Sequence, residues 1–275
     1  MSRLWRDRLY LAIAPDRIVL VRTHGRLRPR VVAKAIVPVA HAASGWEPAI
    51  AALAPLLADR QWQGTEVRAV LSNDFVRYQL IPWSDAVANA EEREAYVRQS
   101  FAQVYGDDTA QWAYAVSQAG QGTAWLASAV ERALLARLET AVESARSKLV
   151  SAVPHLMPTF NRARRALKHK DMWFVQAEKH RLLLMLILDG RWRIVSSRQI
   201  QEEQWQAQLP LLLEREWCLK GTGQTVPRTV VISAPEAHQA ALDGASKWVF
   251  HWLRLASRHG FSGRAGAPYA MALGR

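Results

Sequence analysis

The sequence is poor in cysteine and in long apolar runs. Cys218 is the single cysteine among 275 residues, so no disulfide can form within the chain and a cysteine-based zinc site is excluded. The longest apolar run, 182–188, is much shorter than the roughly 18 residues that span a bilayer. The charged N-terminus is not followed by an apolar segment of signal-peptide length. These absences favour a cytoplasmic protein.

Acidic residues are also scarce relative to basic ones. Lys and Arg number 36 and Asp and Glu number 24, which gives a formal net charge of +12. Such a charge attracts nucleic acid, the inner leaflet of a membrane or an acidic protein. An arginine-rich composition inherited from a GC-rich genome explains the same number without any anionic partner. Both interpretations stay open at this point.

Two segments, 10–37 and 173–196, share one hydrophobic pattern. Each consists of short β-rich runs divided by turn dipeptides, a pattern typical of a three-stranded meander. The expected strands are 10–14, 17–22 and 31–37 in the first segment, and 173–177, 182–188 and 192–196 in the second. The expected turns are Pro15–Asp16 and His24–Gly25 in the first, and Lys179–His180 and Asp189–Gly190 in the second. We interpret Asp189–Gly190 as a hairpin turn.

Each meander is followed by the same kind of elements. Apolar residues at helical spacing predict helices over 46–57 and 201–217, and β-rich runs predict strands over 66–71 and 229–233. Pro210 is expected to kink the second helix or to delay its start. A short helix over 235–242 and a strand over 247–255 complete the second half.

The first half carries additional elements. We expect a helix over 85–105, a hairpin over 112–127, a helix over 131–149, a short strand over 150–153 and a closing helix over 158–167. The whole pattern predicts an α/β protein with a duplicated actin-like (ribonuclease-H-like) two-lobed fold. The first lobe would span 1–168, with an inserted helix and hairpin at about 85–130. The second would span 169–256, and the glycine-rich 257–275 would be a flexible tail.

The segment 70–83, Val-Leu-Ser-Asn-Asp-Phe-Val-Arg-Tyr-Gln-Leu-Ile-Pro-Trp, resembles a stretch of the actin-like proteins of type IV pilus and type II secretion systems, the PilM-like and GspL-like proteins. The resemblance implies a cytoplasmic scaffold that couples a membrane assembly platform to other machinery. It also implies that the first lobe binds the short cytoplasmic tail of a membrane partner, for which Arg77 and Trp83 are the interface candidates. Since GspL-like proteins continue into a spanning helix and 275 residues here contain none, we expect membrane attachment through a partner.

The signatures of an actin-like ATPase are missing or degenerate. In those enzymes the first turn of each lobe carries a strand-terminal Asp followed by glycine, whose backbone amides hold phosphate while the carboxylate organises Mg²⁺. The corresponding turns here, 14–17 and 177–181, contain no glycine, and Pro15 has no amide to donate. Ala234–Pro235 stands where a Gly–Gly pair would pack against adenosine. We therefore expect no cofactor and no catalysis. Asp16 is the residual candidate for a metal-binding carboxylate, should ATP and Mg²⁺ still bind.

Two further segments could bind partners. The basic run 162–170, with Arg162, Arg164 and Arg165, is either a solvated linker helix or a contact with anionic lipid, and nucleic acid is a weaker alternative because no aromatic residues interleave the charges. In 247–255, Trp248, Phe250 and Trp252 share one strand face, which favours core packing over docking of a partner peptide.

The leading hypothesis is a non-catalytic cytoplasmic scaffold of a pilus or secretion assembly platform, peripheral to the inner membrane and bound to a membrane partner protein. A divergent actin-like nucleotide-binding ATPase and a basic nucleic-acid-binding protein are the alternatives. No small-molecule substrate is expected.

Overall fold

The computed structural model describes residues 7–25, 29–40, 45–117, 120–166, 171–201, 204–220, 225–237, 247–253, 261 and 263–274. By its contacts the chain divides into two compact units. Unit 1 consists of Met1–Val76, Glu131–Ala166 and Arg254–Arg275, and unit 2 consists of Arg77–Val130 and Leu167–Leu253.

Unit 1 is built on a five-stranded sheet whose strands follow the order β3-β2-β1-β4-β8. The strands are β1 (Arg8–Ile13), β2 (Arg17–His24), β3 (Arg30–Pro38), β4 (Glu66–Leu71) and β8 (Lys148–Pro154). β1 runs antiparallel to β2 and parallel to β4, and β4 runs parallel to β8. The carboxyl ends of β1, β4 and β8 therefore meet at one edge of the sheet.

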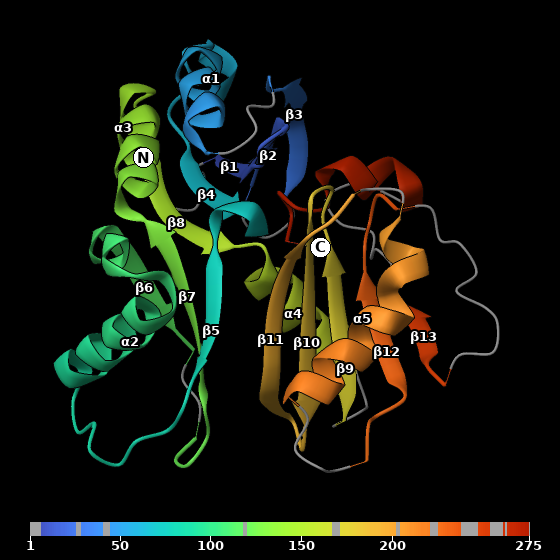
Figure 1. Cartoon of the computed structure of the whole chain (residues 1–275). Coiled ribbons are helices and arrows are strands. Elements are labelled where there is room, and N and C mark those ends of the chain that lie inside the picture. The colour runs from blue at the N-terminus through green and yellow to red at the C-terminus, as the bar shows by residue number, and fades with distance from the viewer. Residues whose placement is uncertain are drawn as a thin grey trace. The chain divides into compact units, whose positions relative to one another are not determined.

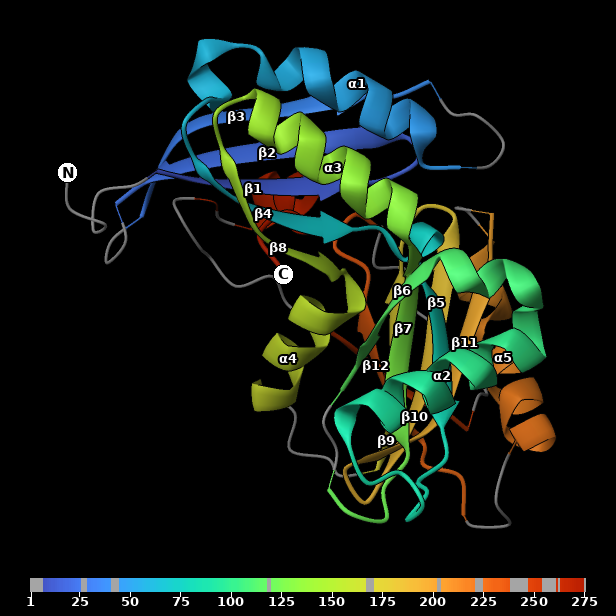
Figure 2. The same cartoon turned by 90° about the vertical axis from the view of Figure 1, so that its left-hand side faces the viewer.

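Two helices of unit 1 lie side by side on one face of this sheet, as Figure 2 shows. They are α1 (Glu47–Leu57) and α3 (Arg132–Ser144), and the unit also contains α4 (Leu156–Ala166), η2 (Arg60–Trp62) and η3 (Asn73–Phe75). α3 buries Leu134, Leu138, Ala141 and Val142, which recur at helical spacing, so its amphipathic pattern decides which side faces the sheet.

The C-terminal segment packs on the sheet of unit 1, contrary to the expectation of a flexible tail over 257–275. Phe261, Met271, Ala272 and Leu273 are buried in one cluster with β-strand residues that include Val19, and η5 (Gly263–Tyr269) contacts β2. The repeated glycines of this segment suggested a flexible chain, whereas its apolar residues, such as Phe261 and Leu273, are the ones that reach the sheet.

Unit 2 repeats this topology. Its larger sheet has the order β11-β10-β9-β12-β13, with β9 antiparallel to β10 and parallel to β12 (Figure 1). The strands are β9 (Met172–Ala177), β10 (Arg181–Leu188), β11 (Arg191–Gln199), β12 (Thr229–Ser233) and β13 (Val249–Trp252). All six residues of β9 are buried, as is typical of a strand covered on both faces. Trp248, Phe250 and Trp252 pack onto the core of this sheet, as predicted.

α5 (Trp205–Lys220) follows β11 and continues through Pro210. Proline removes one backbone bond near the start of the helix, while Leu209 and Leu213, both fully buried, hold the helix on the sheet. The helix expected over 201–217 thus starts and ends later. Cys218 is exposed on it. The short helix expected over 235–242 lies largely outside the described residues.

A third sheet, with the order β5-β7-β6, belongs to unit 2. It consists of β5 (Arg77–Ile81), β6 (Trp112–Val116) and β7 (Trp125–Glu131), with α2 (Ala90–Tyr105) and η4 (Asp107–Gln111) between β5 and β6. α2 packs on the sheet through Val97 and Phe101. From the sequence we assigned this insertion to the first lobe. The contacts of the inserted residues group them with unit 2, because β5 lies beside β11 (Figure 1).

Two helices are several residues shorter than predicted. α2 starts at Ala90 rather than 85, since the side chain of Asn89 accepts the N–H of Glu92 at 2.9 Å and the Glu92 carboxylate accepts the N–H of Ala88 at 2.7 Å. α3 ends at Ser144 rather than 149, because Arg146 adopts a left-handed backbone with φ 54° and the chain then enters β8.

Candidate functional site

The carboxyl ends of β1, β4 and β8 are where an open α/β sheet places ligands, so this edge of unit 1 is the first candidate. The turn after β1 is closed by a hydrogen bond from the N–H of Ala14 to the C=O of Arg17 at 3.0 Å. Pro15 and Asp16 form the two-residue loop, and the C=O of Asp16 accepts the N–H of Val39 at 2.8 Å. Since Pro15 has no N–H, Asp16 holds the only amide of the loop.

The loop therefore differs from a phosphate-binding loop, in which several consecutive amides converge on the anion. Asp16 itself is half-buried. Within the described part of the chain, no group of three or more His, Cys, Asp or Glu side chains could hold a metal ion. No set of carboxylates among these residues therefore supports the prediction that Asp16 binds a metal ion.

Buried polar residues follow β4 at the same edge. Ser72 and Asn73 are completely buried. The hydroxyl of Ser72 accepts the N–H of Asp74 at 3.1 Å and lies 3.2 Å from its carboxylate, which starts η3. The side-chain oxygen of Asn73 accepts the N–H of Leu156 at 3.3 Å. These side chains join the end of β4 to the start of α4, so they have a structural use.

The same edge of the larger sheet in unit 2 has the same geometry. The N–H of Glu178 donates to the C=O of Arg181 at 2.8 Å, which leaves Lys179 and His180 as a two-residue loop. The C=O of His180 accepts the N–H of Ile200 at 3.0 Å. Both units therefore close their first hairpin, and tie their third strand to it, with equivalent bonds.

Asp189–Gly190 is a hairpin turn, as predicted. The turn joins Leu188 to Arg191, which pair directly, and both turn residues have left-handed backbones, with φ 53° at Asp189 and φ 71° at Gly190. Such dihedral angles match the twist of a two-residue hairpin. The pair thus belongs to the β10–β11 connection and not to a nucleotide site.

The two interface candidates of the 70–83 segment lie at opposite ends of β5. Arg77 begins the strand and is half-buried. Trp83 follows its end, donates its Nε1–H to Asp85 at 2.9 Å, and packs edge-on against Trp125 with ring centroids 5.3 Å apart. At about 3.3 Å per residue, Arg77 and Trp83 are roughly 20 Å apart along the strand. The structure does not bring these two side chains together.

The basic candidates lie on α4. Arg164 is exposed, Arg162 is half-buried, and Ala163 between them is 4% exposed. The side chain of Arg165 and the rest of the basic run, 167–170, lie outside the described residues. Of the two candidate arginines whose side chains are described, Arg162 and Arg164, the structure exposes Arg164 to solvent.

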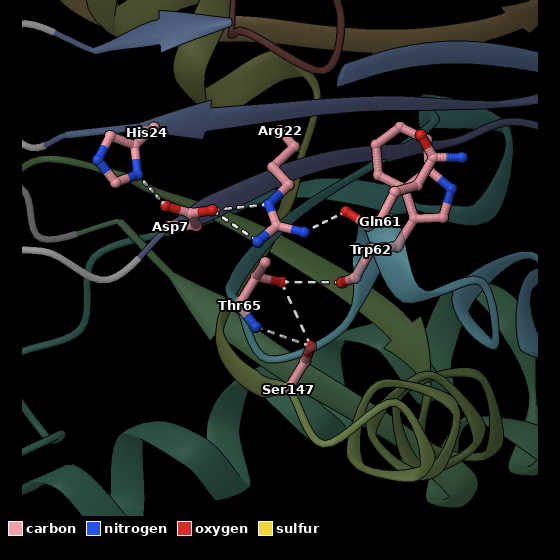
Figure 3. A network of polar contacts seen from close by, with 7 residues as sticks. All are labelled: Asp7, Arg22, His24, Gln61, Trp62, Thr65 and Ser147. Carbon is pink, nitrogen blue, oxygen red and sulfur yellow. Dashed lines mark hydrogen bonds and ion pairs between the residues drawn. The ribbon is translucent and has the colours of Figure 1, made fainter. Parts of the chain in front are cut away.

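A polar network at the opposite end of the sheet of unit 1 was not predicted (Figure 3). Asp7, just before β1, accepts bonds from the Nε of Arg22 at 2.8 Å and from the Nδ1 of His24 at 2.6 Å. Arg22 also donates to the C=O of Gln61. Burial raises the pKa of the Asp7 carboxyl, but the hydrogen bonds and charges of His24 and Arg22 outweigh it and leave that pKa below its usual value.

The same network continues through two hydroxyls. Thr65 Oγ1 donates to the C=O of Trp62 at 3.3 Å and lies 3.3 Å from Ser147 Oγ, which accepts the N–H of Thr65 at 3.1 Å (Figure 3). The network therefore joins the starts of β1, β4 and β8 to the end of β2. Its partners are far apart in the sequence, so no local pattern indicates it.

Comparison with known proteins gives the fold. No family model and no curated protein sequence matches the chain. The cytoplasmic domain of EpsL, an inner-membrane component of the type II secretion system of Vibrio cholerae, has a TM-score of 0.57 at 12% identity over 97% of this chain and 94% of that chain. The PilM–PilN type IV pilus biogenesis complex has a TM-score of 0.57 at 16% identity, covering 84% and 81%.

A third similar structure is a protein of unknown function with an actin-like ATPase fold from Bacteroides thetaiotaomicron, with a TM-score of 0.55 at 7% identity over 85% of each chain. No helix in the described ranges is long and apolar enough to cross a membrane. The fold predicted from the duplicated meander is confirmed: the chain has the duplicated α/β fold of the actin-like proteins, which it shares with components of pilus and secretion systems.

Proposed function

We propose that this chain is a non-catalytic cytoplasmic subunit of a pilus or secretion assembly platform, peripheral to the inner membrane, and that it binds a membrane partner protein. The observation that carries the proposal is the likeness to the cytoplasmic domain of EpsL, which extends over 97% of this chain and 94% of that domain. The likeness to a PilM–PilN complex points to the same kind of assembly.

The proposal of a non-catalytic role rests on the two first turns. Pro15–Asp16 and Lys179–His180 are both two-residue loops without glycine. In each loop, the C=O of the second residue accepts the N–H of the residue that follows the third strand. A loop that holds a phosphate uses several converging amides, commonly those of a glycine-rich turn, whereas Pro15 has no amide to donate and neither turn contains glycine. A divergent ATPase is the second candidate, and only the likeness of the fold supports it.

Site-specific photo-crosslinking in cells tests the partner. A photoreactive phenylalanine at Arg77, Trp83 or Arg164 samples the three candidate regions, and the same group at Glu139, exposed on α3, is the matched control. The proposal expects one integral membrane protein to be captured from at least one candidate position and not from Glu139. Capture of soluble proteins alone, or of nothing from any of the three positions, contradicts it.

Attachment to the membrane is tested separately with lipid vesicles. The net charge of +12 and the exposed Arg164 on α4 favour binding to anionic headgroups, each basic residue contributing about 1 kcal/mol near the surface. Sedimentation with vesicles containing phosphatidylserine, but not with phosphatidylcholine alone, is expected, and Arg164→Glu should reduce it. Equal sedimentation with both vesicles would show that anionic headgroups do not drive binding, and no sedimentation with either leaves the membrane partner as the only attachment.

A further inference from the structure

β3 is the outer strand of the sheet in unit 1, and no strand in the described part of the chain lies on its far side. It is nine residues long, with exposed and half-buried positions alternating along it. A long edge strand exposes a row of backbone hydrogen-bonding groups, and native proteins usually cover, shorten or charge such an edge.

The hydrogen-bond register tells which backbone groups of β3 face outward. Val39 donates to Asp16, so these two residues form a bonded pair, and bonded pairs alternate along an antiparallel ladder. Ala35 and Val37 therefore bond to β2, while Lys34 and Ile36 direct their N–H and C=O groups away from the sheet. Pro38 occupies the next outward position, where its missing N–H removes no ladder bond.

The side chains along this edge combine apolar surface with positive charge. Val32 is 54% exposed and Ile36 is 39% exposed. The Nζ of Lys34 lies 5.1 Å from the ring centroid of Phe261 and 5.2 Å from that of Tyr269, so the C-terminal segment holds the ammonium group against the sheet.

Neither β3 nor its neighbour β2 contains an acidic residue. β2 and β3 together carry Arg17, Arg22, Arg30 and Lys34, and the carboxylate of Asp7, outside these strands, pairs with Arg22. A second copy of this chain paired along β3 would bring Arg30 and Lys34 of both copies onto one edge. Charge complementarity therefore favours an acidic occupant over self-association.

We infer that β3 binds an extended segment of a partner protein by strand addition, and that this segment places an acidic residue opposite Lys34 and an apolar residue two positions away, on the same face, beside Ile36. The backbone of Lys34 and Ile36 supplies the hydrogen bonds, and the apolar side chains of the segment cover Val32 and Ile36. Among the other outer strands, β13 is less suitable, because it has only four residues and its Phe250 packs onto the core of its own sheet.

This inference rests on the proposed partner-binding function but can fail independently of it. Capture of a membrane protein from Arg77, Trp83 or Arg164 supports the function whatever happens at β3, whereas the experiment on β3 uses the purified chain and a synthetic peptide.

The probe is a fluorescein-labelled peptide that repeats valine, threonine, glutamate and threonine, so that valine and glutamate share one strand face. It is titrated by fluorescence anisotropy, and the same peptide with lysine in place of glutamate is the charge control. Ile36→Pro removes an outward-facing N–H together with the exposed apolar side chain, and should weaken binding at least about fivefold, the effect of one lost hydrogen bond. Lys34→Glu should weaken binding of the glutamate peptide about tenfold and favour the lysine peptide. Lys148→Glu makes the same charge reversal on β8, at the other edge of the sheet, and should leave binding unchanged.

Amide hydrogen exchange of the same complex locates the peptide. The N–H groups of Lys34 and Ile36 should exchange rapidly in the free protein and about tenfold more slowly with peptide, while those of Ala35 and Val37 are protected in both. The absence of peptide binding overturns the inference, as does binding without protection at Lys34 and Ile36. Protection that depends on protein concentration and needs no peptide also overturns it, since the occupant is then a second copy.

Discussion

The N–H of Val39 donates to the C=O of Asp16 at 2.8 Å, and the N–H of Ile200 donates to the C=O of His180 at 3.0 Å. Each bond joins the residue after the third strand of a unit to the second residue of its first turn. The internal duplication therefore extends from strand order to individual hydrogen bonds. It also means that both first turns contribute backbone groups to the sheet itself.

The Asp7 network should stabilise unit 1 in a pH-dependent way. Asp7→Asn removes the carboxylate that pairs with Arg22, whose side chain is only 21% exposed, so we expect a loss of about 1 to 3 kcal/mol in unfolding free energy at pH 7. Because the pKa of Asp7 is lowered in the folded state, its carboxylate stabilises the fold above about pH 4, its ordinary range, and the contribution disappears as the pH falls through the folded pKa.

Urea unfolding of wild type and Asp7→Asn at pH 7 and pH 3 measures this effect. The difference between the two proteins should shrink toward zero at the lower pH. Asp108→Asn changes an exposed carboxylate that has no partner among the described residues, and is the control. A difference that persists unchanged at pH 3 contradicts the electrostatic role of Asp7.

Glu216 on α5 should be a second stabilising carboxylate. Its side chain is 1% exposed, forms an ion pair with Arg198 on β11, and lies 3.4 Å from the Nζ of Lys220. Burial raises its pKa, but the bonds and charges of Arg198 and Lys220 leave that pKa below the usual value. Removing one partner of a buried pair leaves the other charge uncompensated, so Glu216→Gln should cost about 3 kcal/mol.

Glu214→Gln is the matched control on the same helix. Glu214 pairs with Lys247 at 3.1 Å, but both side chains are 45% exposed, and such surface pairs contribute about 0 to 1 kcal/mol. Guanidinium unfolding at pH 7 compares the two variants. Equal losses in both would show that burial of Glu216 is not what makes its pair stabilising.

The C-terminal segment should contribute to the core of unit 1. Leu273 is 5% exposed against the sheet, so Leu273→Ala should lower the unfolding free energy by about 2 to 4 kcal/mol. Leu211→Ala removes the same atoms from a side chain that is 69% exposed on α5 and should change stability by less than about 0.5 kcal/mol. Thermal unfolding distinguishes them, and similar small effects would restore the expectation of a flexible tail.

Much of the fold could be predicted because local patterns determine it. β4 and β12 coincide with the predicted strands 66–71 and 229–233, and Asp189–Gly190 forms the predicted turn, since alternation and turn dipeptides act over a few residues. The end of α3 could not be predicted, because apolar spacing continues into β8 and only the left-handed Arg146 separates them.

Features that depend on contacts between distant residues could not be predicted from the sequence. Asp7 meets Arg22 and His24 through strand pairing, and Thr65 meets Ser147 across 82 positions, so no spacing rule indicates either contact. The burial of Leu273 depends likewise on a sheet formed by the other end of the chain. The interface candidates came from a resemblance, and Arg77 and Trp83 stay predictions until a partner is captured.

Calorimetric titration of the purified chain with ATP and Mg²⁺ tests the central claim most directly. A non-catalytic scaffold whose first turns are the tight loops Pro15–Asp16 and Lys179–His180 predicts no binding tighter than about 1 mM. Binding at about micromolar affinity, especially if Asp16→Ala abolishes it, would contradict the account and assign the chain a nucleotide-dependent role.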